Sequence, residues 1–220
     1  MPGSRRARGR VPVASPSIRD VLLEERLIGY LDPGAEEYLL KINGAGVTTS
    51  SSCTGRITIV EGRWHWLRDE ARIVYKTHKE IEPEALARVL SRPFSDLWLK
   101  VTGPIIHARV PSLECAMRVL EVARSAGFKH SGVLHASPEE GYVIELLSAV
   151  QISLPLKLEG RYVVSPAMLG ELARMANEAL REGWSRLGRL ADSLLSLPCP
   201  APPQPQEHLD RRPDAALGHA

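Results

Sequence analysis

The stretch Leu97–Val110, LWLKVTGPIIHARV, decides the class of fold that the sequence predicts. It contains two short apolar runs, LWLKV and IIHARV, which are typical of β-strands. Only Thr102, Gly103 and Pro104 separate the two runs. Three residues leave no room for the helical crossover that parallel neighbours require. We therefore expect strands that are close in the sequence to be antiparallel.

Further strand and helix patterns surround this stretch. Strands are expected at residues 57–60, 71–76, 132–135, 142–147 and 151–158. Helices are expected after Asp32-Pro33 as an N-cap and first-turn proline, over residues 83–90, after Ser112 and after Ser165-Pro166. The sequence thus predicts an α+β fold with helices packed on a mixed or mostly antiparallel sheet.

Composition and length indicate one globular domain between two tails. The chain has 220 residues, of which 44% are hydrophobic and 25% charged, as in ordinary globular proteins. Residues 1–17 are rich in arginine and residues 197–220 in proline, so we expect disordered tails around a single α+β domain at 18–196. No apolar run approaches the roughly 20 residues of a membrane span, and no secretory signal is evident. These features favour the cytoplasm and no membrane association.

Charge, cysteine content and missing motifs narrow the function. The net charge of +2 gives no overall attraction to nucleic acid, so such binding would need a local patch. Cys53, Cys115 and Cys199 are few and far apart, which fits neither a disulfide framework nor a zinc site. We expect three reduced thiols and no metal. The glycine-rich Rossmann signature, the phosphate loop and the H-E-x-x-H motif are absent from the sequence.

The run of hydroxyl side chains in Val47–Val60, VTTSSSCTGRITIV, contains the candidate site. We expect a loop that leads into a strand, where hydroxyls and backbone amides can bind a carboxylate or phosphate. Gly55 permits a backbone conformation or close approach that a Cβ would block. Arg56 adds a planar cation suited to bidentate anion binding. The alternative is a polar loop whose hydroxyls satisfy only their own backbone.

A cysteine and three histidines are further candidates. Cys53 lies near a cation that can lower a thiol pKa, but a small buried side chain is the favoured interpretation. His78 follows a predicted strand and His107 interrupts an apolar one. Either can be hydrogen-bonded structure or can converge on one pocket. His65, flanked by two tryptophans, is expected to be an exposed hairpin residue.

The stretch TSSSCTGRI at residues 49–57 resembles the signature Thr-Thr-Ser-Ser-Cys-Ser-Gly-Arg-Ile of the tRNA wybutosine-synthesising methyltransferase family, the third enzyme of that pathway. Other landmarks follow in the family's order, and the resemblance covers residues 20–190. They are the helix start at Asp32, Asn43, Thr77-His78, PIIHARV at 104–110, AGFKHSGV at 126–133, Pro155, and VSPAMLGELARMAN ending at Asn177.

The resemblance implies an S-adenosylmethionine-dependent enzyme that methylates the N4 ring nitrogen of a tricyclic wyosine derivative beside the anticodon of phenylalanine tRNA. It also implies a fold other than the Rossmann-type methyltransferase fold. By position, the catalytic set is Ser52, Cys53, Arg56, His78 and His107, and the binding set is Asn43, Thr49, Ser50, Ser51, Gly55 and Asn177. The chain departs from the family pattern at Thr102-Gly103-Pro104 and in the segment before Asp32, where substrate contacts would differ.

A mechanism follows from combining these interpretations. We expect Arg56, with Ser51 and Ser52, to bind the carboxylate of the methyl donor or the anionic tail of the modified base. His78 or His107 would accept a proton from the nitrogen or orient the ring. All these groups would then face one shared cavity.

Two alternatives remain open at the level of sequence. The first is a non-catalytic tRNA-binding module that grips phosphates with the same loop and with the Arg5–Arg10 segment. The second is a thiol-dependent acyl-transfer or hydrolytic enzyme built on Cys53 and one histidine. In the methyltransferase interpretation Cys53 is first a wall of the pocket.

Overall fold

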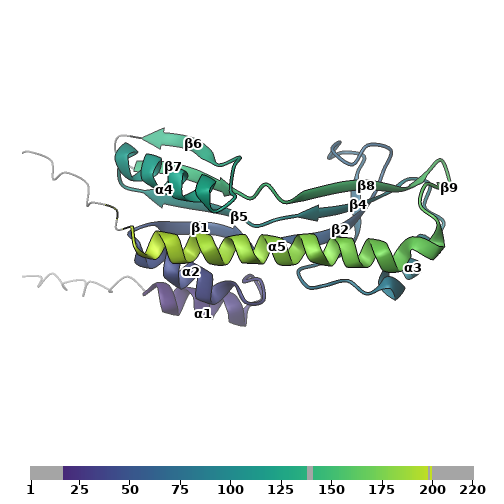
Figure 1. The fold of residues 1–220 in the computed structure, drawn as a ribbon, viewed down its shortest axis with the longest axis horizontal. Helices are drawn as coiled ribbons and strands as arrows, with labels where there is room; N and C mark the ends of the chain where they lie inside the picture. The colour runs from purple at the N-terminus through teal and green to yellow at the C-terminus, as the bar shows by residue number, and fades with distance from the viewer. Residues whose placement is uncertain (1–16, 138–140, 198, 200–220) are drawn as a thin grey trace, which may run out of the picture.

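The computed structural model describes residues 17–137, 141–197 and 199 of the chain. The described residues form five α-helices and nine β-strands in the predicted α+β arrangement (Figure 1). Most of both predicted tails lies outside the described residues, as does part of the predicted turn at 136–141. None of the helices within the described ranges has the length and hydropathy that a bilayer crossing requires.

The strands form two sheets. In the first sheet the order is β1 (Thr48–Cys53), β5 (Ile105–Val110), β7 (Gly141–Leu147) and β6 (Gly132–Ser137). In the second it is β3 (Arg72–Thr77), β2 (Arg56–Glu61), β4 (Leu97–Thr102), β8 (Gln151–Leu158) and β9 (Arg161–Tyr162). Each of these pairings is antiparallel, which confirms the predicted strand direction.

Three short links carry the chain from one sheet directly into the other. Thr54-Gly55 joins β1 to β2, Gly103-Pro104 joins β4 to β5, and residues 148–150 join β7 to β8. β4 pairs with β2 and β8, while β5 pairs with β1 and β7, so the stretch LWLKVTGPIIHARV spans both sheets instead of forming a hairpin. At Gly55, φ is +104°, and a Cβ would lie 3.0 Å from the Thr102 carbonyl oxygen. Glycine is therefore required at this link.

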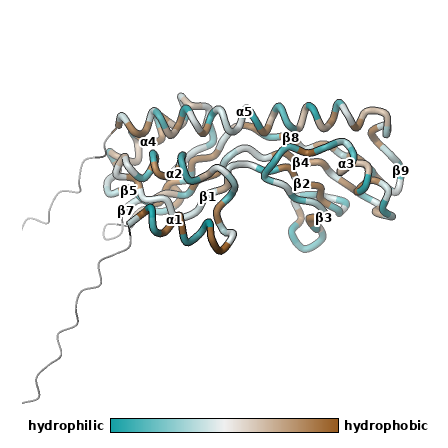
Figure 2. The backbone as a smooth tube through the Cα atoms, turned by 90° about the horizontal axis from the view of Figure 1, so that it is seen from below, coloured by the Kyte–Doolittle hydropathy of each residue, from teal (hydrophilic) through white to brown (hydrophobic). Residues whose placement is uncertain are grey.

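The long helix α5 (Leu169–Leu195) runs along one face of both sheets (Figures 1 and 2). The predicted helix start at Ser165-Pro166 forms a short 3-10 turn, η1 (Pro166–Met168), that leads directly into α5. Leu187 and Leu194 belong to the hydrophobic core of the first sheet, whereas Leu172 and Leu180 belong to that of the second. α5 therefore holds the two sheets together through two separate cores.

Four shorter helices complete the fold. They are α1 (Ile18–Leu27), α2 (Ala35–Gly44), α3 (Pro83–Leu90) and α4 (Leu113–Ser125). α4 starts as predicted, because the Ser112 hydroxyl accepts a hydrogen bond from the Cys115 amide. The predicted cap at Asp32 is wrong: Gly34, with φ +77°, occupies the N-cap of α2. The Asp32 side chain is thereby free for another partner.

Other local expectations are also wrong. The hydroxyl run forms β1 and not a loop, because it pairs with β5 along its length. Cys115 and Cys199 form a disulfide across 84 positions, and the Cys199 amide donates to the Ala45 carbonyl, which places the end of the described chain against the first core. Among the described residues, Cys53 is the free thiol. His65 is half-buried between Trp66 and Trp98.

Each sheet has a second face, opposite α5, which we call the far face. In β5, Ile106 and Ala108 are buried in the core, so His107 between them points to the far face. In β2, Ile57 is buried in the second core, so Arg56 before it points to the far face. The loop between β2 and β3 projects on the side opposite α5 (Figure 2). The predicted polar site residues therefore gather on the far faces and at the links.

Candidate functional site

A group of polar atoms meets where β1 passes into β2. Asp32, in the segment between α1 and α2, accepts hydrogen bonds from the Thr54 amide at 2.7 Å and from its hydroxyl at 3.2 Å. His78 directly follows β3, and its Nδ1 lies 3.0 Å from the Gly55 carbonyl oxygen and 3.1 Å from Asp32 Oδ2. Three segments that are distant in the sequence thus converge. We call Asp32, Cys53, Thr54, Gly55 and His78 the junction cluster.

The hydrogen bonds of His78 determine the tautomer of its neutral ring. Both close neighbours of Nδ1 are acceptors, so Nδ1 carries the hydrogen and Nε2 keeps the lone pair. The side chains of His78 and Asp32 are 18% and 15% exposed. The pair is thus shielded from water and still accessible. An imidazole held in this way can accept a proton at Nε2, and the nearby carboxylate stabilises the resulting imidazolium.

Cys53 lies beside this histidine but is not activated by it. Its Sγ is 4.0 Å from His78 Nδ1, a donor atom that cannot remove the thiol proton. Burial is the largest influence on the thiol and raises its pKa; the Asp32 charge also raises the pKa, while the Gly55 backbone and Arg56 lower it. The net pKa lies above the ordinary value, so the group is a protonated thiol at neutral pH. This argues against the thiol-enzyme alternative.

The junction cluster also offers one ligand atom each from Asp32, Cys53 and His78, all within 4.8 Å of one another. Each side chain already has a protein neighbour: Thr54 for the carboxylate, Gly55 for the imidazole, and the imidazole for the thiol. These contacts explain why the three side chains lie together in the junction cluster.

A second polar chain crosses the far face of the first sheet. The register places Ser51 opposite His107, and His107 opposite Glu145. His107 Nδ1 lies 3.0 Å from Ser51 Oγ, and Nε2 lies 3.0 Å from Glu145 Oε1. A carboxylate only accepts, so Nε2 carries hydrogen and Nδ1 accepts from the Ser51 hydroxyl. Both ring nitrogens are engaged, which leaves Ser51 oriented and polarised.

The two groups adjoin each other along β1. Ser51 and Cys53 are two residues apart on a strand, so their side chains share a face at a spacing of about 7 Å. Ser50 donates to the His107 carbonyl oxygen at 3.3 Å. Ser52 lines a narrow cleft between β1 and α1 together with its neighbours Ser50 and Ser51. Ser50 and Ser51 therefore contact His107, whereas Ser52 lies opposite Ile106 and points to the other face of β1.

Arg56 lies in a different hollow from the serines. Its neighbours are Thr58, His65, Arg68 and Lys100, around a volume of about 220 Å³ on the far face of the second sheet. The structure brings Cys53 and His78 together, and Ser51 with His107, but it does not bring the Arg56 guanidinium into the serine cleft.

The two predicted asparagines hold segments that flank the site. Asn43 accepts from the Thr49 amide at 3.0 Å and donates to its hydroxyl at 2.8 Å, which ties α2 to the start of β1. Asn177 accepts from the Ile81 amide at 2.8 Å and donates to its carbonyl at 3.0 Å. Because their amides are occupied by backbone and hydroxyl partners, both asparagines position the chain around the site.

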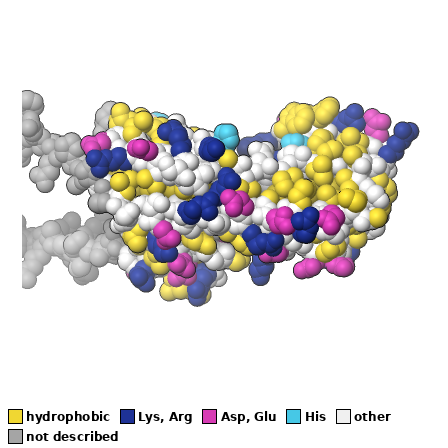
Figure 3. Space-filling view, viewed as in Figure 1, with side chains coloured by type: hydrophobic (Ala, Val, Ile, Leu, Met, Phe, Trp, Pro, Cys, Tyr) yellow, Lys and Arg dark blue, Asp and Glu magenta, His cyan; other side chains and the backbone are white. Residues whose placement is uncertain are grey.

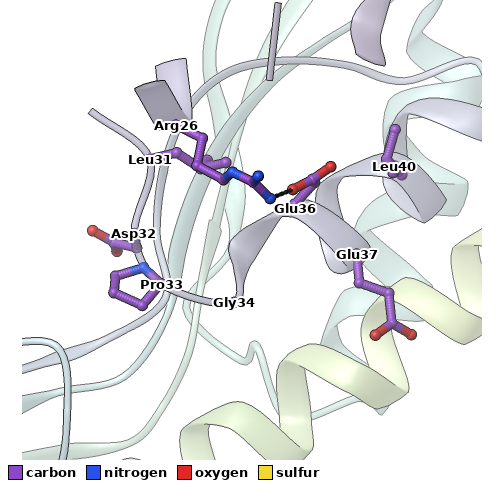
Figure 4. Close-up of a pocket in the computed structure, with 8 residues that line it drawn as sticks. All are labelled: Arg26, Leu31, Asp32, Pro33, Gly34, Glu36, Glu37 and Leu40. Carbon is purple, nitrogen blue, oxygen red and sulfur yellow. Dashed lines mark hydrogen bonds and ion pairs between the residues drawn. The ribbon is translucent and has the colours of Figure 1, made fainter. Parts of the chain in front are cut away.

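A larger hollow of about 630 Å³ adjoins the junction cluster (Figure 4). It is lined by Arg26, Leu31, Asp32, Pro33, Gly34, Glu36, Glu37 and Leu40. Arg26 and Glu36 form an ion pair at 3.0 Å, and the Asp32 carboxylate points away from this pair (Figure 4). The lining thus combines acidic and apolar groups, which suits a ligand with cationic and apolar parts.

Sequence reasoning missed Asp32 and Glu145 as site residues. In the sequence, Asp32 has the features of a helix N-cap. Nothing there indicates its hydrogen bond with Thr54, which is 22 positions away. Glu145 interrupts the apolar strand YVIELL, as His107 interrupts IIHARV. A polar residue within an apolar strand can indicate a functional site. Only the strand register, however, shows that His107 and Glu145 lie opposite each other.

Comparison with known proteins identifies the family. The family profile described as Methyltransferase TYW3 matches residues 16–196. A tRNA(Phe) 7-((3-amino-3-carboxypropyl)-4-demethylwyosine(37)-N(4))-methyltransferase from Aeropyrum pernix is 53% identical over 173 residues, which cover 78% of this chain and 91% of the relative. A protein of the same name from Saccharolobus solfataricus is 37% identical over 178 residues, covering 80% and 85%.

Solved structures support the same conclusion. A crystal structure of a hypothetical protein from Aeropyrum pernix matches with a TM-score of 0.70 and 45% identity, covering 76% of this chain and 98% of the other. A Pyrococcus horikoshii protein matches with a TM-score of 0.71 and 28% identity, covering 79% and 90%. Since the profile spans both sheets and α5, this chain belongs to the TYW3 methyltransferase family.

Proposed function

We propose that this chain transfers the methyl group of S-adenosylmethionine to N4 of 7-(3-amino-3-carboxypropyl)-4-demethylwyosine in phenylalanine tRNA. Two relatives, at 53% and 37% identity, are named for this activity, and membership of a methyltransferase family implies a methyl donor. A cytoplasmic location belongs to the proposal and is supported by the tRNA substrate in those names. The observation that carries the proposal is the His78–Asp32 pair, whose geometry leaves Nε2 available as a proton acceptor.

Proton removal is the chemical task that we assign to this pair. As the N4–methyl bond forms and the sulfur–methyl bond breaks, the donor becomes a neutral thioether and the ring nitrogen becomes positively charged. Transfer of the N4 proton to His78 Nε2 removes that charge. Asp32 then faces an imidazolium at 3.1 Å and stabilises it. No covalent enzyme intermediate is needed, which agrees with the protonated Cys53 thiol.

Binding and alignment are the other requirements, because the nitrogen, the methyl carbon and the sulfur must lie in line. We place the donor in the hollow beside Asp32, where carboxylates suit its sulfonium and ammonium groups and Leu31 and Leu40 suit its adenine. Ser51, held by His107 and Glu145, keeps lone pairs for orienting the base.

The rival function is a non-catalytic tRNA-binding module. Such a module does not require a shielded imidazole of fixed tautomer, and it predicts no stabilisation by S-adenosylmethionine. A specific ligand raises the free energy of unfolding by RT ln(1 + [L]/Kd). We therefore expect the melting temperature to rise with S-adenosylmethionine and with its demethylated product. If neither compound raises the melting temperature, the proposed methyl donor is wrong.

The decisive assay measures transfer of a labelled methyl group to tRNA that carries the demethylwyosine base. We expect His78→Gln to lower the rate by about 100-fold or more, the usual effect of losing a general base. The thermal shift with the donor should persist in this variant, because glutamine keeps a polar side chain at the junction. His130→Gln is the matched control, since His130 is exposed on the segment between α4 and β6. Equal rates for native and His78→Gln proteins would remove His78 from the mechanism.

A further inference from the structure

The hollow around Arg56 is built from three strands and a loop. Its side chains come from β2, from β4, from Ile73 of β3 and from the loop that joins β2 to β3. The register places Arg56 opposite Thr102 and Thr58 opposite Lys100. Arg56 and Lys100 are therefore diagonal neighbours on one face of the sheet, a spacing of about 7–8 Å between backbones. Arg68 reaches the same hollow from the loop.

These cations differ from the cations on α5 in having no acidic partner. Within the described residues, no carboxylate forms an ion pair or hydrogen bond with Arg56, Arg68 or Lys100. On α5, by contrast, Arg174 contacts Glu171 at 2.7 Å, and positive and negative side chains lie side by side (Figure 3). In the part of the chain that the structure describes, no carboxylate contact thus balances the positive charge around this hollow.

Lys100 shows that this arrangement is unfavourable without a ligand. Burial, followed by repulsion from Arg56, lowers the pKa of its ammonium group. An anion between the two cations would oppose this lowering of the pKa, because an opposite charge stabilises the charged form. His65 also lines the hollow. The site is therefore prepared for an acceptor-rich group.

The size and chemistry of the hollow identify the class of ligand. Its volume of about 220 Å³ is below the roughly 300–1,000 Å³ of pockets that enclose whole small molecules. A guanidinium, an ammonium and threonine hydroxyls are the donors that commonly bind phosphate oxygens of nucleic acids. The site fits one charged group that belongs to a larger ligand.

We infer that this hollow binds a backbone phosphate of the RNA next to the base that is methylated. Arg56 follows Cys53 of the junction cluster by three positions, so the two lie within about 10 Å along the chain. A base at the junction cluster would place a flanking phosphate over the far face of the second sheet. The inference rests on the proposed function for the identity of the RNA. It gives Arg56 a role in holding the substrate instead of the donor.

The test compares charge-removing variants by their tRNA affinity over a range of KCl concentrations, without methyl donor. Each lost phosphate contact should reduce the slope of log K against log salt by about 0.7–0.9. We expect Lys100→Gln and Arg68→Gln each to show this reduction and a severalfold weaker affinity at low salt. Arg88→Gln is the matched control, because Arg88 is exposed on α3, on the α5 side of the same sheet. Slopes in Lys100→Gln and Arg68→Gln equal to that of Arg88→Gln would overturn the inference.

A second comparison separates a backbone phosphate from the carboxylate on the modified base. Binding is measured with tRNA that carries the demethylwyosine base and with an unmodified transcript. A phosphate contact predicts the same loss for both RNAs, whereas a loss confined to the modified RNA would overturn the inference. Thermal unfolding of each variant checks folding independently. If the native chain transfers no methyl group but the slopes still change as expected, the proposed function fails and the phosphate site stands.

Discussion

At the scale of single residues, His78 and His107 differ in their hydrogen bonds, and for this reason we propose different roles for them. Among the described residues, His78 Nδ1 has hydrogen-bond partners and Nε2 has none, whereas both nitrogens of His107 are engaged. The sequence presents both as similar candidates, because each lies in or beside an apolar strand. The difference arises from Asp32 and Glu145, which come from distant segments. The sequence alone therefore does not show which histidine is the better candidate for the general base.

Glu145 is a positioning residue in this scheme, and Glu145→Gln tests it. The amide can accept or donate, so it no longer fixes the tautomer of His107 or the direction of the Ser51 hydroxyl. We expect kcat for methyl transfer to fall about tenfold, as for other residues that orient a functional side chain. The tRNA affinity and its salt dependence should stay unchanged. A merely structural role predicts instead a lower melting temperature with native kcat in the folded fraction.

Cys53 should be dispensable for chemistry. The raised thiol pKa keeps the side chain neutral at pH 7–8, and only the thiolate is nucleophilic. We expect Cys53→Ala to retain methyl transfer within about fivefold of the native rate. In the native protein, alkylation by iodoacetamide should begin at a higher pH than in the unfolded chain, where the thiol pKa is about 8.5. Complete loss of transfer in a folded Cys53→Ala protein would restore the thiol to the mechanism.

At the scale of elements, the point where α5 passes the link between the sheets is tightly packed. A Cβ on Gly183 would lie 2.9 Å from Cδ of Pro104, in the link between β4 and β5. At Gly188 on the same helix, the nearest atom would be 3.8 Å away, at Tyr38. Alanine favours a helix over glycine by about 1 kcal/mol, so the two positions isolate the effect of close packing.

We expect the two glycine substitutions to change stability in opposite directions. Gly188→Ala should raise the free energy of unfolding by up to about 1 kcal/mol, because only the helix propensity changes. Gly183→Ala should lower it by about 1–3 kcal/mol, since α5 or the rigid proline ring must move. Urea denaturation of both variants measures the difference. If Gly183→Ala raises the free energy of unfolding, the link between β4 and β5 can move to accommodate the added methyl group.

The elements that the sequence predicted well are those with local signals. Ser112 and the proline at residue 83 mark the starts of α4 and α3, and the apolar runs LWLKV and IIHARV mark β4 and β5. The sequence of β1 predicts a loop because serine is typical of turns, while the pairing of β1 with β5 spans more than 50 positions. Similarly, no local pattern shows that LWLKV and IIHARV belong to different sheets. Both features depend on pairing between strands that are distant in the sequence.

At the scale of the whole molecule, the site depends on how the two sheets are joined. The junction cluster takes Asp32 from the α1–α2 segment, Cys53 from the first sheet and His78 from the end of a strand in the second. α5 packs on both sheets, and Asn177 on this helix holds Ile81, three residues beyond His78. The position of the imidazole that we propose as the base is thus linked to the packing that holds the two sheets together.

The disulfide between Cys115 and Cys199 completes this architecture, and its loss gives the last prediction. It joins α4 to the segment after α5 and closes a loop with a sequence separation of 84. A cross-link of this span restricts the unfolded chain and stabilises the folded state by about 4 kcal/mol in the chain-entropy model.

We expect Cys199→Ser to lower the free energy of unfolding by roughly 2–4 kcal/mol in guanidinium denaturation. Cys53→Ser is the control, because it changes a thiol that is not cross-linked. Addition of a reducing agent should bring the native protein to the stability of Cys199→Ser and leave that variant unchanged. Equal stability of the native and Cys199→Ser proteins under oxidising conditions would show that the cross-link does not contribute to the fold.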